Sequence, residues 1–223
     1  MIKLLTLISI AFFSTTLLAQ PTKRYKPGMT VSEIRKIKLD EKAAAKEAIT
    51  VLHEGVLLVR LNFKEEQVKY FEKFNNTKEV DRIRKTELKL NLNIIKAFND
   101  LYKFSPVYFF GMTDSRLVAE GKFNEVTFYN NQGLADSSIK LKSNNILIAE
   151  FGMVEADTSN NQGATTSMSA LVVRSNEFVQ LRDPFPFYAG YFPVVRAKKR
   201  FRMPVLRLNE RLHNFYLKSV PVE

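Results

Sequence analysis

Polar residues that could bind an anion follow two apolar stretches that we predict to be parallel strands. The stretches run from Val56 to Phe63 and from Pro106 to Phe110. In open α/β sheets, ligands bind beyond the carboxyl ends of such strands. A short helix predicted after the second stretch would add free backbone N–H groups. The candidate ligand-binding residues are Asn62, Lys64, Thr113, Asp114, Ser115 and Arg116.

Helix capping is the simpler role for two of these residues. If Asp114 or Ser115 stands at the N-cap, its side chain accepts hydrogen bonds from the backbone N–H groups that would otherwise bind an anion. Gly111 alone falls short of the Gly-x-Gly-x-x-Gly and Gly-x-x-x-x-Gly-Lys fingerprints, so the sequence predicts no nucleotide site. Capping and anion binding both stay open.

A second candidate is the segment from Asp183 to Arg202, in which aromatic residues precede a run of cations. Rings and guanidinium groups could stack on a ligand and pair with its phosphates or carboxylates. Alternatively, the rings cover a sheet edge and the charges face water. The candidate residues for a partner-binding or anion-binding surface are Phe187, Tyr188, Tyr191, Lys198, Lys199, Arg200 and Arg202.

Catalytic chemistry has weaker support in the sequence. His53 and His213 fall in predicted helices without a His-Glu-x-x-His frame, and cysteine is absent. No Gly-x-Ser-x-Gly elbow occurs. Glu150, Asp157 and Asp183 could pair as in glycosidases, but no spacing singles them out. We therefore predict no catalytic residue, metal ligand or cofactor, with a hydrolase-type enzyme acting on a small anionic substrate at the strand ends as the alternative.

The first 19 residues predict export. Lys3 precedes the apolar run Leu4 to Leu18, which ends at Ala19, as in a cleaved signal peptide. A membrane anchor is the alternative, but the run is shorter than the roughly 20 residues that cross a bilayer. Leu17 stands where a small residue is preferred, and without cysteine the chain cannot become a lipoprotein. We expect a secreted or periplasmic protein with no transmembrane helix in its mature form.

The net charge of +11 indicates which classes of partner the protein could bind. Such an excess of Lys and Arg attracts anionic surfaces through a field that salt weakens. Because an exported protein does not meet cellular nucleic acid, we expect a protein partner or an anionic envelope polymer or lipid. The leading hypothesis is a non-catalytic exported binding protein.

Local patterns then predict the elements that carry these candidates. A capping box of Thr30 and Glu33 starts a helix of about 20 residues that Gly55 stops, with a break near Asp40 as an alternative. The following helices are expected at 65–74, 79–102 and 204–216, the last with Pro204 in its first turn. Further strands are expected at 125–130, 146–151, 170–174 and 177–181, with at most an edge strand at 139–142.

This order predicts a three-layer α/β domain with a mixed sheet, parallel at its start and antiparallel at its end. Thioredoxin-like and Rossmann-like arrangements both fit, and without cysteine the former would lack its redox chemistry. Residues 106–110 are expected at the centre of the sheet. The domain spans residues 30–223, after a flexible basic arm at 20–29, and contains a mobile loop at 154–167.

Overall fold

The computed structural model describes residues 28–155 and 168–219, apart from the side chains at 197 and 198. The predicted signal peptide at 1–19 lies outside these residues. So do most of the predicted arm at 20–29 and most of the predicted loop at 154–167.

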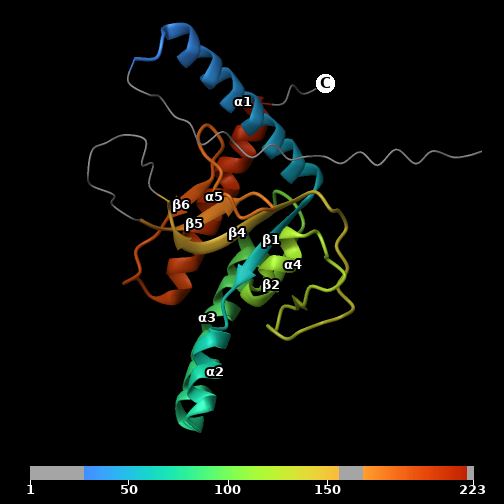
Figure 1. The fold of residues 1–223 in the computed structure, drawn as a ribbon, viewed down its shortest axis with the longest axis vertical. Helices are drawn as coiled ribbons and strands as arrows, with labels where there is room; N and C mark the ends of the chain where they lie inside the picture. The colour runs from blue at the N-terminus through green and yellow to red at the C-terminus, as the bar shows by residue number, and fades with distance from the viewer. Residues whose placement is uncertain (1–27, 156–167, 220–223) are drawn as a thin grey trace, which may run out of the picture.

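A six-stranded mixed sheet forms the middle of the molecule, in the order β3-β2-β1-β4-β5-β6 (Figure 1). The three strands β2, β1 and β4 are parallel, and the remaining pairings are antiparallel. This confirms the predicted α/β class with a mixed sheet. The bounds are β1 (Val56–Leu61), β2 (Val107–Gly111), β3 (Phe128–Tyr129), β4 (Ile146–Met153), β5 (Ser169–Arg174) and β6 (Tyr188–Gly190).

Helices lie on both sides of the sheet. The long helices α1, α3 and α5 share one core with its first face, and the short α4 packs with the segment 120–145 on the second face. The α2–α3 hairpin extends beyond one end of the sheet (Figure 1). The bounds are α1 (Val31–Glu54), α2 (Glu65–Lys73), α3 (Thr77–Leu101), α4 (Ser115–Ala119) and α5 (Ala197–Ser219), with a 3₁₀ turn η1 (Met112–Asp114).

Alternation along β1 divides its side chains between the two faces. Leu57 and Val59 belong to the core under the long helices, and Leu58 belongs to the core under α4. Because successive side chains point to opposite faces, Arg60 shares the second face with Leu58. The first core includes the fully buried Phe98 of α3, and burial of such a ring contributes about 2–3 kcal/mol.

The ends of α1 follow the sequence signals. The Thr30 hydroxyl accepts a hydrogen bond from the Glu33 amide at 3.3 Å, and the Glu33 carboxylate accepts one from the Thr30 amide at 2.7 Å. This second bond holds the pKa of Glu33 below its usual value. Gly55 follows the last helical residue as predicted, whereas the suggested break near Asp40 does not occur. The alanine-rich sequence after Asp40 explains why the helix continues.

Two strand predictions need correction. The strand after Pro106 exists, but β1 rather than β2 lies in the middle of the sheet, with β2 one place from the edge. The expected strand at 125–130 shrinks to the two residues of β3. Residues 139–142, for which the sequence predicts at most an edge strand, form no strand. Ile139 and Leu141 instead pack as partly buried side chains on the core under α4.

The expected second strand at 177–181 is also absent. Phe178 has φ 63°, in the left-handed region, which turns the chain and leaves a single bridge between Arg174 and Gln180. The antiparallel partner of β5 is β6, with Val172 opposite Tyr188. A turn inside the apolar run therefore replaced a simple two-residue hairpin.

The last helix begins earlier than predicted. It starts at Ala197, so Pro204 is an interior residue rather than a first-turn residue. Proline has no N–H to donate to the carbonyl of Arg200, four residues before it, which costs the helix one hydrogen bond. Pro204 is buried, and its neighbour Val205 belongs to the main core, so packing offsets that cost.

Candidate functional site

The carboxyl ends of β1 and β2 meet, because Leu61 pairs with Gly111, but the polar residues that follow are already bonded. The side-chain oxygen of Asn62 accepts a hydrogen bond from the Lys64 amide at 2.8 Å. Lys64 lies 2.9 Å from the carboxylate of Glu87, a residue that is only 6% exposed. Lys64 therefore compensates a buried charge instead of presenting a free ammonium group.

The residues after β2 use their polar atoms to hold the local chain. The Asp114 carboxylate accepts a hydrogen bond from the Thr127 amide at 2.8 Å, and it does not cap α4. The Ser115 hydroxyl donates to the Met112 carbonyl at 2.6 Å. Thr113 is exposed. Neither capping by Asp114 nor capping by Ser115 is present, and α4 is a helix of only five residues.

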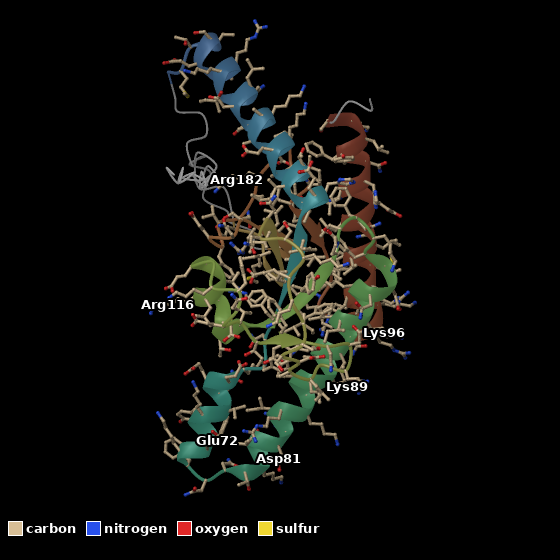
Figure 2. The ribbon with its side chains drawn as sticks, turned by 90° about the vertical axis from the view of Figure 1, so that its right-hand side faces the viewer. Glu72, Asp81, Lys89, Lys96, Arg116 and Arg182 are labelled. Carbon is tan, nitrogen blue, oxygen red and sulfur yellow. The ribbon has the colours of Figure 1, made fainter. Side chains whose placement is uncertain are left out.

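Arg116 points away from the body of the molecule (Figure 2). Its side chain is 88% exposed and pairs with Glu120 at 2.7 Å. Hydrogen bonds from Lys122 and from Arg116 lower the pKa of Glu120 to about 2. The six predicted ligand-binding residues thus lie along one edge, but the two cations among them are each paired with a carboxylate.

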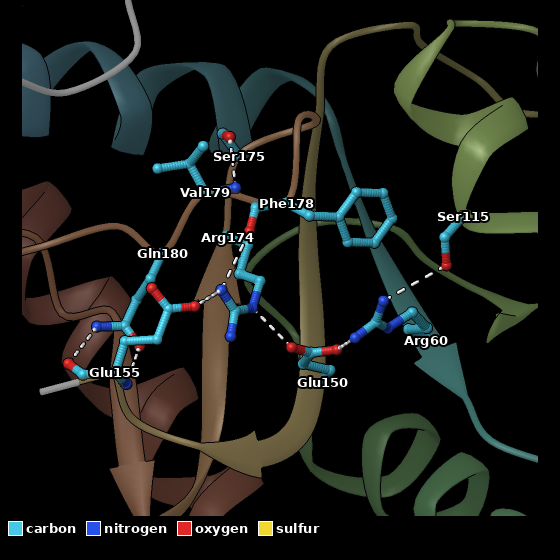
Figure 3. Close-up of polar contacts among 9 residues, drawn as sticks. All are labelled: Arg60, Ser115, Glu150, Glu155, Arg174, Ser175, Phe178, Val179 and Gln180. Carbon is cyan, nitrogen blue, oxygen red and sulfur yellow. Dashed lines mark hydrogen bonds and ion pairs between the residues drawn. The ribbon is translucent and has the colours of Figure 1, made fainter.

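A charged cluster that the sequence analysis missed lies beside this edge, on the second face of the sheet. Figure 3 shows Glu150 of β4 between Arg60 of β1 and Arg174 of β5. Arg60 contacts one carboxylate oxygen through Nη2, and Arg174 donates from Nε to the other at 2.6 Å. The side chain of Arg60 is only 20% exposed, and those of Glu150 and Arg174 are each only 11% exposed. We call these three residues the Arg–Glu–Arg cluster.

The outer atoms of the Arg–Glu–Arg cluster are also bonded (Figure 3). Arg174 donates from Nη1 to Glu155 at 2.5 Å and to the Phe178 carbonyl at 3.0 Å. Arg60 donates to the Ser115 hydroxyl at 3.4 Å, and its guanidinium lies 5.0 Å from the centre of the Phe178 ring. Phe178 therefore contacts both arginines, Arg174 through its carbonyl oxygen and Arg60 through its ring.

Together with Glu155, the Arg–Glu–Arg cluster has no net charge. Desolvation lowers the pKa of Arg174, but the hydrogen bond to Glu155 and the charge of Glu150 outweigh it and leave the pKa raised. Two guanidinium groups face two carboxylates, and both oxygens of Glu150 are engaged. Such an arrangement fixes three strands in register, and it leaves Glu150 without a free oxygen to act as a base. The signals in the sequence were a charge inside two apolar strand patterns, Arg60 and Glu150, and a charge at the end of a third, Arg174.

The aromatic and basic segment divides into a buried part and an exposed part. Phe187 is only 7% exposed and belongs to the main core, so its ring does not face a partner in this structure. Tyr188 and Tyr191 are half-buried, and the Tyr191 ring meets Phe151 edge-on at 5.6 Å. As the simpler interpretation expected, the segment supplies strand β6 and covers the edge of the sheet.

Beyond Tyr191 the chain becomes exposed and basic. Phe192, Val194 and Val195 are 76%, 95% and 38% exposed. Arg196 and Lys199 are exposed without a side-chain bond to any described residue. Between Asp183 and Glu210 the sequence holds no acidic residue, and its cations are Arg196, Lys198, Lys199, Arg200, Arg202 and Arg207. We call residues 192–202 the apolar–basic segment.

Two cations of the apolar–basic segment fix its position. Arg200 donates to the Pro193 carbonyl at 3.0 Å, which ties the loop to the start of α5. Arg202 pairs with Asp100 of α3 at 2.5 Å, and this hydrogen bond lowers the pKa of Asp100. Lys198 lies in the first turn of α5. The loop is therefore anchored, while Arg196 and Lys199 stay available to a partner.

Within the described ranges, no group of three or more His, Asp or Glu side chains could hold a metal ion. Among the described helices, none combines the length and the apolar character needed to span a bilayer. Comparisons with protein-family models, curated proteins and solved structures found no match for this chain.

Proposed function

We propose that this protein is an exported, non-catalytic binding protein that docks on anionic lipid surfaces through the apolar–basic segment. The observation that carries the proposal is the exposure of Phe192, Val194 and Val195 directly before Arg196 and Lys199. Apolar side chains that enter a bilayer interface, next to cations that meet lipid phosphates, are the usual arrangement of peripheral membrane proteins.

The placement of these cations is not explained by helix stability. The amino terminus of a helix carries a partial positive charge, and cations there destabilise it by a few tenths of a kcal/mol each. The first turn of α5 nevertheless contains no acidic residue, and Lys198, Lys199 and Arg200 fall in it. A positive helix end with several cations attracts an anionic surface, which is a reason for this arrangement.

The expected affinity is modest. Each cation near an anionic membrane contributes about 1 kcal/mol, and a fully buried Phe or Val side chain contributes roughly 1.5–3 kcal/mol. Arg196, Lys199 and Phe192 together would then supply about 3.5–5 kcal/mol. Binding of this strength is reversible, and it weakens with salt.

The test is sedimentation of the purified protein with vesicles of phosphatidylglycerol and phosphatidylcholine, at low and raised salt. We expect binding that requires the anionic lipid and falls with salt. The double variants Phe192→Ser/Val194→Ser and Arg196→Gln/Lys199→Gln should each weaken binding by at least about tenfold.

Matched controls lie on the α2–α3 hairpin. Phe74→Ser changes a ring that is 67% exposed, and Lys85→Gln removes an exposed cation with no described side-chain partner. Both should bind vesicles like the unmodified protein. Equal binding by the segment variants and the controls, or binding that ignores vesicle charge, would refute the proposal.

The alternative of a hydrolase at the strand ends has less support. Lys64 and Arg116, the cations that would hold an anionic substrate, are paired with Glu87 and Glu120. Glu150, a second buried carboxylate, has both oxygens engaged by arginines. A screen of phosphoesters and esters that found turnover, lost on Asp114→Ala, would favour the enzyme instead.

A further inference from the structure

A second cluster of cations surrounds a cavity at the opposite end of α5. The cavity has a volume of about 640 Å³ and lies between residues 38–46 of α1, the end of α5 and the loop at 183–184. In Figure 2 these parts of α1 and α5 lie at the same end of the molecule. Its lining includes four lysines and two carboxylates, those of Lys38, Lys42, Lys46, Lys218, Glu41 and Asp183.

The two helices that form the cavity are held together just below it. The rings of His53 and Tyr216 stack with their centres 4.0 Å apart, and Phe104 meets both edge-on. The cavity is therefore built on a fixed contact between α1 and α5. Its volume falls within the range of about 300–1,000 Å³ that is typical of small-molecule sites.

The lining has an excess of positive charge that is not neutralised. Four lysines face two carboxylates, those of Glu41 and Asp183, and none of these six side chains forms an ion pair or a hydrogen bond with a described residue. This differs from the strand ends, where each cation has a carboxylate partner. The excess of two positive charges is available to a ligand.

The spacing of three of these lysines works against α1. Lys38, Lys42 and Lys46 are four residues apart, so they follow one another along one side of the helix. Like charges at this spacing destabilise a helix by about 0.2–0.5 kcal/mol per pair. A multiply charged anion between these lysines and Lys218 would replace this repulsion by attraction, so the same lysines would then stabilise the site.

Apolar surface completes the site. Phe215, which is half-buried, and Pro184 contribute carbon surface beside the ammonium groups. A flexible ammonium group binds phosphate as a point charge, with three donors that can rotate to meet its oxygens. We propose that this cavity binds an organic phosphate that carries an apolar group. The proposal does not depend on membrane docking by the apolar–basic segment.

The first experiment measures binding of naphthyl phosphate to the full chain by calorimetry. We expect saturable binding, with inorganic phosphate weaker and naphthol weaker still. Lys42→Gln and Lys218→Gln should each raise the Kd by about fivefold, and Lys42→Arg should restore it. Lys85→Gln, an exposed charge change on α3, should leave the Kd unchanged.

Two results would overturn the proposal. One is the absence of saturable naphthyl phosphate binding. The other is that Lys42→Gln and Lys218→Gln bind naphthyl phosphate with the same Kd as Lys85→Gln. All these lysines are exposed, so the variants should keep the same unfolding temperature, which shows that a lost affinity is not a lost fold.

Competition identifies the source of the phosphate. Displacement of naphthyl phosphate by glycerol phosphate would assign the site to a free metabolite, whereas displacement only by a short-chain phosphatidic acid would assign it to a lipid. The Phe192→Ser/Val194→Ser variant should bind naphthyl phosphate normally, because 23 residues of α5 place its two ends about 33 Å apart. Failure of membrane docking and failure of this site are therefore distinguishable.

Discussion

Replacement of Glu150 by glutamine is expected to destabilise the fold strongly. The substitution keeps the shape of the side chain and removes its charge. Arg60 and Arg174 would then lie beside a neutral amide on a nearly closed face of the sheet, since these two side chains are only 20% and 11% exposed. Glutamine can accept one of the two hydrogen bonds, but it cannot balance two guanidinium charges.

The size of the loss in unfolding free energy depends on the contacts that each arginine retains in Glu150→Gln. Loss of one partner from a buried ion pair costs about 3–5 kcal/mol. Arg174 retains its bond to Glu155 at 2.5 Å, and Arg60 retains its contact with the Phe178 ring and some access to water. These remaining interactions favour the lower limit, about 3 kcal/mol. For a domain of this size, that lowers Tm by roughly 6–12 °C.

Urea unfolding followed by circular dichroism measures the difference in unfolding free energy. The control is Glu66→Gln, because Glu66 pairs with Lys69 on the surface of α2 and its side chain is 85% exposed. That variant should lose less than about 0.5 kcal/mol. If Glu150→Gln were no less stable than Glu66→Gln, the Arg–Glu–Arg cluster would not stabilise the sheet as argued.

Two further outcomes test local geometry. Gly55→Ala should cost ~3 kcal/mol in urea unfolding, because the new Cβ would collide with the Asn145 carbonyl oxygen, where the chain passes from α1 into β1. Glu120 should titrate near pH 2 in carboxyl-carbon NMR, well below the 4.5 of a free glutamate, and its pKa should rise in Lys122→Gln. Because folding lowers this pKa, the stabilisation is present above pH 4.5 and is lost as the pH falls toward 2.

Much of the architecture could be predicted because the patterns were local and repeated. Two apolar runs separated by two amphipathic helices predict a parallel pair, and Leu57 does lie opposite Val107. The capping box of Thr30 and Glu33 fixed the start of α1, and Gly55 fixed its end. In each case, residues close in sequence made the bonds that defined the element.

The errors arose where distant contacts decide the conformation. The run at 177–181 has the composition of a strand, but Phe178 is left-handed with its ring over Arg60, and only an isolated bridge joins Arg174 to Gln180. Pro204 is a common first-turn residue, yet the core accepts it inside α5. A single sequence does not reveal which distant side chain an element will meet.

The candidate site was harder to predict for the same reason. Arg60, Glu150 and Arg174 lie on three different strands, and each one alone resembles an ordinary charge within an apolar strand or at its end. The register brings them together, with Arg60 opposite Glu150 in the parallel pair. The predicted cations Lys64 and Arg116 were placed at the correct edge, but their carboxylate partners could not be foreseen.

The distribution of paired and free cations decides where an anion can bind. Near the sheet, Arg60, Lys64 and Arg174 each meet a carboxylate within ion-pair distance, so an incoming anion would have to displace a protein carboxylate and leave it buried. At the two ends of α5 that competition is absent, because Lys199 and Lys218 have no described partner. The desolvation cost of displacing a buried carboxylate therefore directs anion binding away from the carboxyl ends of the strands and toward the two ends of this helix.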